Sequence, residues 1–210
     1  MWTDESKISS LIYKVVEEPT AQKLLYQAQF HIEIFKNNSD KLHESFDTLL
    51  FHEFARKNTC HMTEGVFGSD IHTDKMESAK VRVWWFLLTT VTAGYRFLRC
   101  IYNARNKERY EDWKLQRNDL KKLPNEYRRV RNFLEHMDEA VHKGEISELE
   151  HCKFSRHAEL RFVDRYGECS FYFSKEYLET VNAIWQKVIK ILENRKNQKD
   201  KILNDVKIDI

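Results

Sequence analysis

Apolar residues recur every three or four positions along most of this chain of 210 residues, which is the spacing of amphipathic helices. In its first third the pattern predicts helices over residues 4–16, 20–36 and 41–57. The polar run Asn37-Asn38-Ser39-Asp40 between the last two is typical of a helix stop followed by an N-cap. The side chains expected to face inward from the second and third helices are Leu24, Leu25, Ala28, Ile32, Phe35, Leu42, Phe46, Leu49, Leu50 and Phe54.

The middle of the chain begins with a loop signal. Residues 58–73 hold two of the five glycines together with Ser, Thr and Asn, which favours an exposed loop. Helices are then predicted over residues 74–103, 107–122 and 124–142. The first of these contains the most apolar run, residues 83–95, which is too short to span a bilayer. We therefore expect this run to be a helix buried at the centre of the fold.

The last third contains the one change of period. Apolar and polar residues alternate over residues 160–164 and again over 169–173, as in β-strands, and Arg165-Tyr166-Gly167-Glu168 between them predicts the turn of a hairpin. Helical spacing returns over 175–199, and the tail 201–210 is expected to fray. The side chains expected to face inward from this last helix are Tyr177, Val181, Ile184, Trp185, Val188 and Leu192.

Together these elements predict a mostly α fold. We expect an up-and-down helical bundle in a single domain over residues 1–200, with one β-hairpin inserted at about residues 154–173, before the last helix. Composition agrees, because five glycines and two prolines are too few for a many-turned sandwich or propeller. A hydrophobic fraction of 41% argues against intrinsic disorder.

Cysteine usage and the start of the chain indicate a compartment. The cysteines Cys60, Cys100, Cys152 and Cys169 are far apart and form no C-x-x-C pair, which is typical of a reduced cytoplasmic protein. The start MWTDESKISS has neither a basic segment nor an apolar segment of the kind that signal peptides carry. We therefore expect a cytoplasmic protein that does not associate with membranes.

The distribution of charge along the chain is more informative than the net charge. The net charge of +2 is too close to neutral to indicate a partner. Residues 96–131, however, hold 12 basic against 5 acidic residues, and residues 186–201 hold 6 against 2. Such runs are either solvated helix faces or surfaces for an anionic partner such as RNA.

The most distinctive polar group lies on the predicted helix 124–142. Arg128, Asn132 and His136 follow one another at intervals of four, so they share a face, and Arg131 lies beside it. An arginine can clamp a phosphate with two hydrogen bonds, and a histidine can move a proton near neutral pH. The apolar stripe that would dock this helix on the core comprises Val130, Phe133, Leu134, Met137 and Val141.

The string Arg131-Asn132-x-x-x-His136 resembles the R-x(4–6)-H signature of the HEPN superfamily, the higher eukaryotes and prokaryotes nucleotide-binding domains. The resemblance implies an all-α bundle of two helical hairpins that dimerises, with the two motif copies facing each other across the dimer groove. Many members are metal-independent ribonucleases of toxin–antitoxin, abortive-infection and other defence systems. Others serve as binding or scaffolding modules.

Carried onto this sequence, the resemblance makes Arg131 and His136 the catalytic pair and Asn132 a supporting polar residue. The imidazole would transfer protons and the guanidinium would stabilise the charge of the phosphorane. The expected partners are RNA, a second copy of the chain and a neutralising protein, and no cofactor is expected. The residues expected to bind the RNA backbone are Arg128, Arg129, Lys121 and Lys122.

Plainer interpretations remain open for the motif. Arg131 and Glu135 are four apart and can form an ordinary ion pair within one helix, and His136 can be a half-buried structural histidine. A non-catalytic helical module that binds nucleic acid or protein through its basic segment is therefore the alternative function. Arg156, Arg161 and Arg165 near or on the hairpin fit either a solvated face or an RNA-binding finger.

Other residue groups give weaker signals. Glu139-x-x-His142 has the form found in di-iron bundles, but the nearest second copy is Asp40-x-x-His43, with Asp for Glu. Cys60-His61 and His72 flank the predicted loop without a second close ligand pair, so we expect loop residues and no metal site. The consecutive Trp84, Trp85 and Phe86 cover most of a helix circumference, which favours a core helix over a platform for stacking bases.

Overall fold

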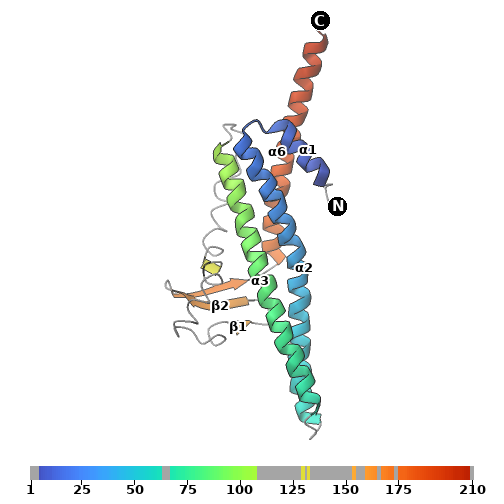
Figure 1. Cartoon of the computed structure of the whole chain (residues 1–210), viewed down its shortest axis with the longest axis vertical. Coiled ribbons are helices and arrows are strands. Elements are labelled where there is room, and N and C mark those ends of the chain that lie inside the picture. Colours follow the sequence, from blue (N-terminus) through green and yellow to red (C-terminus); the bar gives the residue numbers. More distant parts are fainter. Residues whose placement is uncertain are drawn as a thin grey trace. The chain divides into compact units, whose positions relative to one another are not determined.

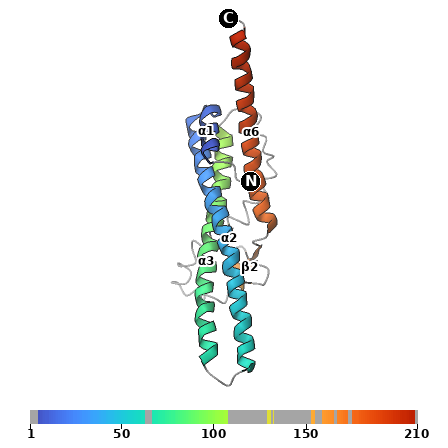
Figure 2. The same ribbon diagram turned by 90° about the vertical axis from the view of Figure 1, so that its right-hand side faces the viewer.

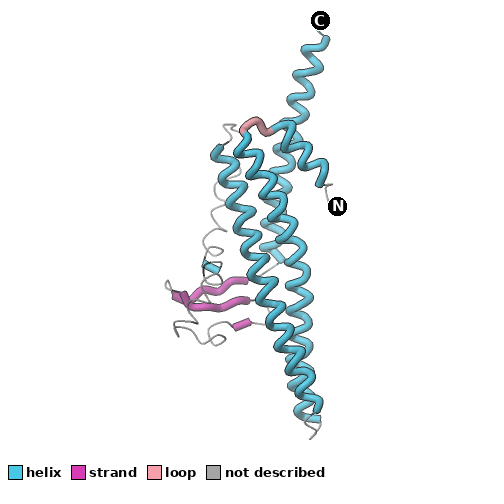
Figure 3. Tube along the Cα trace, in the orientation of Figure 1, coloured by secondary structure: helices cyan, strands magenta, loops and turns pink. Residues whose placement is uncertain are grey.

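The computed structural model describes residues 5–62, 67–107, 129–130, 132, 153–154, 159–164, 167–172 and 175–208. Long helices account for most of these residues, so the prediction of a mostly helical chain is confirmed (Figures 1 and 3). The helices are α1 (Glu5–Val15), α2 (Pro19–Met62), α3 (Phe67–Lys107) and α6 (Lys175–Ile208). The strands are β1 (Lys153–Phe154), β2 (Glu159–Asp164) and β3 (Gly167–Tyr172). Apart from Lys107, the last residue of α3, the predicted helix over 107–122 lies outside the described residues, and so does nearly all of the one over 124–142.

The chain divides into two compact units. The first contains residues 1–33, 94–125 and 179–210, and the second contains residues 34–93 and 126–178. Helices α2 and α3 therefore each contribute one part to the first unit and the other part to the second.

The first unit is built from α1, the beginning of α2, the end of α3 and most of α6. Polar bonds join its helices: the Ser9 hydroxyl donates to Gln29 Oε1 at 3.2 Å, and the Tyr26 hydroxyl donates to the Ser9 carbonyl at 3.2 Å. Lys199 of α6 donates to Glu17 Oε1 at 2.8 Å, near the start of α2. Its buried core includes Ile8, Ile12, Leu25, Ala28, Ile32, Phe97, Ile101, Val181, Ile184, Trp185, Val188 and Leu192.

The second unit is centred on an antiparallel pair formed by α2 from residue 34 and α3 up to residue 93, which run side by side (Figure 2). Its buried residues recur at helical spacing along both helices, as an amphipathic pair requires. They are Phe35, Leu42, Phe46 and Leu49 on α2, and Met76, Ala79, Val83, Leu87 and Val91 on α3. Most of the residues expected to face inward before residue 57 are therefore buried.

The predicted break at residues 37–40 is wrong, because α2 is continuous from Pro19 to Met62. Ser39 bonds back to its own helix, since its hydroxyl donates to the Phe35 carbonyl at 2.5 Å, and one turn later His43 Nδ1 lies 2.8 Å from the Ser39 carbonyl. The helix-propensity cost of such residues is at most about 0.7 kcal/mol each. Burial of a side chain such as Leu42 contributes roughly 1.5–3 kcal/mol, which outweighs that cost.

Two further boundaries differ from the sequence-based prediction. Most of the predicted loop over 58–73 is helical, because α2 continues to Met62 and α3 begins at Phe67. The predicted fraying from residue 201 is also wrong, because α6 continues to Ile208. No glycine or proline lies between residues 175 and 208 to end that helix.

The expectation that residues 83–95 form a helix buried at the centre of the fold is confirmed only in part. Val83 and Leu87 are buried, but Trp85 between them is 63% exposed. Phe54 of α2, expected to face inward, is 67% exposed as well. Both helices bury one stripe and expose the other, so bulk and apolarity alone do not identify the buried side.

The strands form an antiparallel sheet in the order β1-β2-β3. Its register pairs Lys153 with Arg161, and its last pair, Asp164 with Gly167, leaves two residues between β2 and β3. The predicted turn spans four residues, 165–168, and the predicted second strand begins at residue 169, whereas β3 begins at Gly167. Gly167 and Glu168, which the sequence pattern assigns to the turn, therefore pair with Asp164 and Val163 in the ladder.

Candidate functional site

The structure describes only part of the Arg131-Asn132-x-x-x-His136 segment. Residues 129, 130 and 132 are helical, Val130 is fully buried, and Asn132 is half-buried. Two positions along a helix correspond to a rotation of roughly 200° about its axis, so Asn132 lies on a different side of the helix from the buried Val130. Helicity, a buried Val130 and a partly accessible Asn132 are what the amphipathic interpretation of this segment predicts. Arg131 and His136 lie outside the described residues.

The predicted RNA-binding residues are mostly outside the described part as well. Arg129 is half-buried on the same helical segment. Arg128, Lys121 and Lys122 lie outside the described residues, and so do Glu139 and His142 of the E-x-x-H string.

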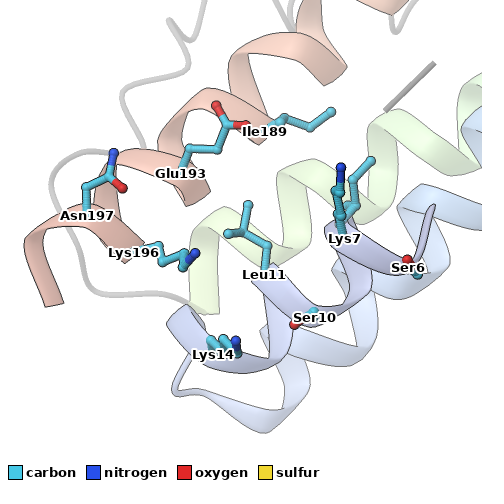
Figure 4. Close-up of a pocket in the computed structure, with 10 residues that line it drawn as sticks. Ser6, Lys7, Ser10, Leu11, Lys14, Ile189, Glu193, Lys196 and Asn197 are labelled. Carbon is cyan, nitrogen blue, oxygen red and sulfur yellow. The ribbon is translucent and has the colours of Figure 1, made fainter. Parts of the chain in front are cut away.

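A groove lined by both polar and apolar side chains lies between α1 and α6 within the first unit, and Figure 4 shows the side chains of both helices around it. Its volume is about 730 Å³, which is in the range of small-molecule sites. It is lined by Ser6, Lys7, Ile8, Ser10, Leu11, Lys14, Ile189, Glu193, Lys196 and Asn197. We call this the α1–α6 groove.

The α1–α6 groove is positively charged. Lys7 and Lys14 follow one another at an interval of seven on α1 and are exposed, and Lys196 of α6 is half-buried. Among the described lining residues Glu193 is the one carboxylate, so three ammonium groups stand against one negative charge there. Ammonium, hydroxyl and amide groups can all donate hydrogen bonds, so the groove suits an anion such as a phosphate.

The sequence alone indicates this groove only in part. The excess of basic residues over 186–201 includes Lys196, but no sequence spacing connects it with Lys7 and Lys14, about 180 residues earlier. Lys199, from the same stretch, does not line the groove; it forms an ion pair with Glu17 at 2.8 Å. The local excess of basic residues therefore indicates the α6 side of the groove, whereas the α1 side can be identified only from the fold.

A pair of histidines joins α2 and α3 in the second unit. Nδ1 of His52 lies 3.2 Å from Nδ1 of His72, and the ring centroids are 5.5 Å apart. Burial is the main cause that lowers the pKa of His52, and the nearby His72 and Lys75 lower it further. Both side chains are half-buried. The interpretation of His72 as a loop residue is wrong, because it lies on α3, and Cys60 and His61 lie on α2.

The other metal candidates are not assembled. Asp40 and His43 are both exposed in the middle of the continuous α2, where no helix begins. Within the described ranges, no cluster of three or more His, Cys, Asp or Glu side chains has the arrangement of a metal site. A pair such as His52 and His72 falls below that number.

Among the groups of the first unit with shifted pKa values are an imidazole, that of His31, and a thiol, that of Cys100. Burial, and then the charge of Arg96, lowers the pKa of His31. Burial raises the pKa of the Cys100 thiol, although Arg99 and Arg96 oppose the shift. Cys100 Sγ lies 3.8 Å from Gln27 Oε1. A thiol with a raised pKa is a weak nucleophile, so Cys100 is suited to packing.

The comparisons provide no relative for this chain: no family model, no curated protein and no solved structure matches it. Among the helices that the structure describes, none has both the length and the apolarity needed to cross a membrane.

Proposed function

We propose that this chain is a metal-independent RNA endonuclease of the HEPN type. The observation that supports the proposal is the string Arg131-Asn132-x-x-x-His136 on a segment that is helical at residues 129, 130 and 132. Val130 is buried there and Asn132 is half-buried, as expected if the polar face of the helix is accessible.

Each polar group has a role in this chemistry. His136 would remove the proton from the ribose 2′-hydroxyl or protonate the leaving 5′-oxygen, and Arg131 would stabilise the charge on the phosphorane. Asn132 would hold the phosphate or the imidazole in position. Since one imidazole performs one proton transfer at a time, a second copy of the motif from a homodimer would supply the other. This is why the proposal includes a dimer.

The remaining parts of the proposal follow from the same resemblance. The sheet would be a hairpin-based insertion before the last helix of an up-and-down bundle. The protein would act in the cytoplasm as a component of a defence or toxin system, held inactive by a neutralising protein.

The test is RNA cleavage by the purified full chain in the presence of EDTA, combined with sedimentation analysis of its oligomeric state. The proposal expects a dimer that cleaves RNA at an unchanged rate when divalent ions are removed. A monomer that leaves RNA intact under all ionic conditions would contradict it.

A second candidate function is a non-catalytic module that binds RNA. The α1–α6 groove favours it, because Lys7, Lys14 and Lys196 concentrate positive charge at one site. Binding through such contacts weakens as salt concentration rises, because counterions are released from the phosphates. If the chain is such a module, RNA binding should depend on salt and no RNA should be cleaved, whereas the endonuclease should cleave RNA.

A further inference from the structure

Two imidazoles, those of His52 and His72, lie close together in the second unit and take no part in the proposed nuclease chemistry. Their Nδ1 atoms face each other at 3.2 Å, within hydrogen-bonding distance. A hydrogen bond between two imidazoles requires one nitrogen to donate and the other to offer a lone pair. The native arrangement therefore presents at least one unprotonated ring nitrogen beside a second imidazole.

The separation of these two nitrogens also matches metal coordination. A zinc ion binds histidine nitrogen at about 2.0–2.1 Å. Two nitrogens at that distance from one ion and 3.2 Å from each other subtend an angle of roughly 100° at the ion, between the octahedral and tetrahedral values. An ion at that distance lies about 1.3 Å to the side of the line that joins the two nitrogens, so both rings turn toward it when the ion replaces the shared proton.

From this geometry we propose that His52 and His72 bind one divalent transition-metal ion through their Nδ1 atoms. Imidazole suits Zn²⁺, Ni²⁺ and Cu²⁺, and the affinity for such ions increases from Ni²⁺ to Cu²⁺. The two imidazoles supply two of the ligands of the ion. The site is separate from the proposed nuclease chemistry, which uses no metal.

The position of the two histidines gives the ion a structural effect. His52 belongs to α2 and His72 to α3, within one unit, so the ion links two helices that bury an apolar stripe against each other. An ion that binds only when both ligands are in place stabilises the folded state by mass action. The melting temperature therefore rises with the concentration of the ion.

The surroundings of the pair set a limit on affinity. Lys75, exposed on α3, is close enough for its charge to act on His52. A positive charge beside the ion weakens binding, so Lys75→Gln should tighten it several-fold. Because this substitution leaves both histidines in place, it measures the effect of the nearby charge on metal affinity separately from the effect of losing a ligand.

The experiment is isothermal titration of Ni²⁺ into the metal-free full chain, repeated for His52→Ala, His72→Ala and the control His43→Ala. His43 is an exposed histidine of the same helix, whose Nδ1 lies next to the backbone carbonyl of Ser39. The proposal expects one ion per chain, an affinity at least about tenfold weaker in each of the first two variants, and no change in the control. A thermal melt with and without Ni²⁺ should show a rise that both alanine variants lose.

A second measurement is independent of whether the variants fold. The electron paramagnetic resonance spectrum of the wild-type chain with one equivalent of Cu²⁺ should show coupling to nitrogen from two imidazoles. Unchanged Ni²⁺ affinity in both alanine variants, or a Cu²⁺ spectrum with coupling to a single nitrogen or to none, would overturn the proposal. A wild-type chain that takes up no ion at millimolar concentration would overturn it too.

Discussion

Phe97 of α3 and Trp185 of α6 meet edge to face in the core of the first unit, with ring centroids 5.8 Å apart and ring planes at 81°. Both side chains are buried: Phe97 is fully buried and Trp185 is 2% exposed. Edge-to-face pairs of this kind stabilise the fold by about 0.5–1.5 kcal/mol in addition to the stabilisation from burying their surface. The contact joins residues far apart in sequence, so it ties the last helix to the rest of the unit.

Replacement of Trp185 should therefore be costly. Trp185→Ala is expected to lower the free energy of unfolding by about 3–5 kcal/mol, because it leaves a cavity beside Phe97. The matched control is Trp85→Ala, since Trp85 is 63% exposed and should change stability by about 0.5 kcal/mol or less. Urea unfolding followed by circular dichroism measures both, and equal decreases would show that the assignment of the core is wrong.

The continuity of α2 can be tested at Lys41. If a helix began after an N-cap at Asp40, proline at position 41 would occupy the first helical position, where it is well tolerated. In the continuous helix it removes a backbone hydrogen bond and should cost about 3 kcal/mol or more. Lys41→Ala keeps the backbone hydrogen bond and serves as the control; it removes only the contact of Lys41 Nζ with the Phe86 ring, 5.8 Å from the ring centroid, and should cost no more than about 1 kcal/mol. Equal stability of the two variants would contradict the continuous helix.

The pH dependence of stability should depend on His31. Its pKa in the folded state is lowered by burial and by Arg96, so folding favours the neutral imidazole. The contribution is complete above the unfolded pKa of about 6.5 and is lost as the pH falls through that value toward the lower folded pKa. The urea midpoint of His31→Gln should therefore fall less steeply than that of the wild type between pH 7 and pH 5. Arg96→Gln should flatten the profile in part, and parallel profiles in all three proteins would refute the assignment.

The α1–α6 groove predicts which lysines bind RNA. Lys7→Glu combined with Lys196→Glu should weaken binding of single-stranded RNA at least about tenfold. A plot of the logarithm of the binding constant against the logarithm of salt concentration should also become less steep, by roughly 0.7 for each phosphate that the protein no longer neutralises. Lys23→Glu combined with Lys190→Glu makes the same change of charge at exposed residues outside the groove. Fluorescence anisotropy measures both pairs. Equal weakening would show that only the net charge matters.

The buried apolar positions are the most predictable feature of the fold. The helical period places Ile32, Phe35, Val181 and Val188 on inward-facing stripes, and all four are buried. Which side of an apolar run is buried is less predictable. In the run 83–95 of α3, Trp85 is exposed while Val83 and Leu87 are buried, since only one side of the helix packs against α2.

Helix ends are the least predictable feature. Asn, Ser and Asp favour N-caps, but the same side chains remain in a helix when they bond back to it, as Ser39 does to Phe35, and when apolar neighbours are buried on both sides. Ser45 makes the same kind of bond to the Lys41 carbonyl, at 2.7 Å. Local propensity of less than about 1 kcal/mol per residue cannot decide such cases against tertiary packing.

The candidate sites divide in the same way. Arg131, Asn132 and His136 are recognised from spacing within one helix, which sequence displays directly. The pairing of His52 with His72, and of Lys196 with Lys7, brings together residues from different helices. No local pattern contains that information, because it arises only when the helices pack.

The most direct test of the central claim is cleavage of single-stranded RNA in EDTA by the wild-type chain, by Arg131→Ala and by His136→Ala, with Lys190→Ala as the control variant. We expect the wild type and Lys190→Ala to cleave at equal rates, and both motif variants to cleave at least about a hundredfold more slowly with unchanged circular dichroism. Motif variants that cleave as fast as the wild type would contradict the account.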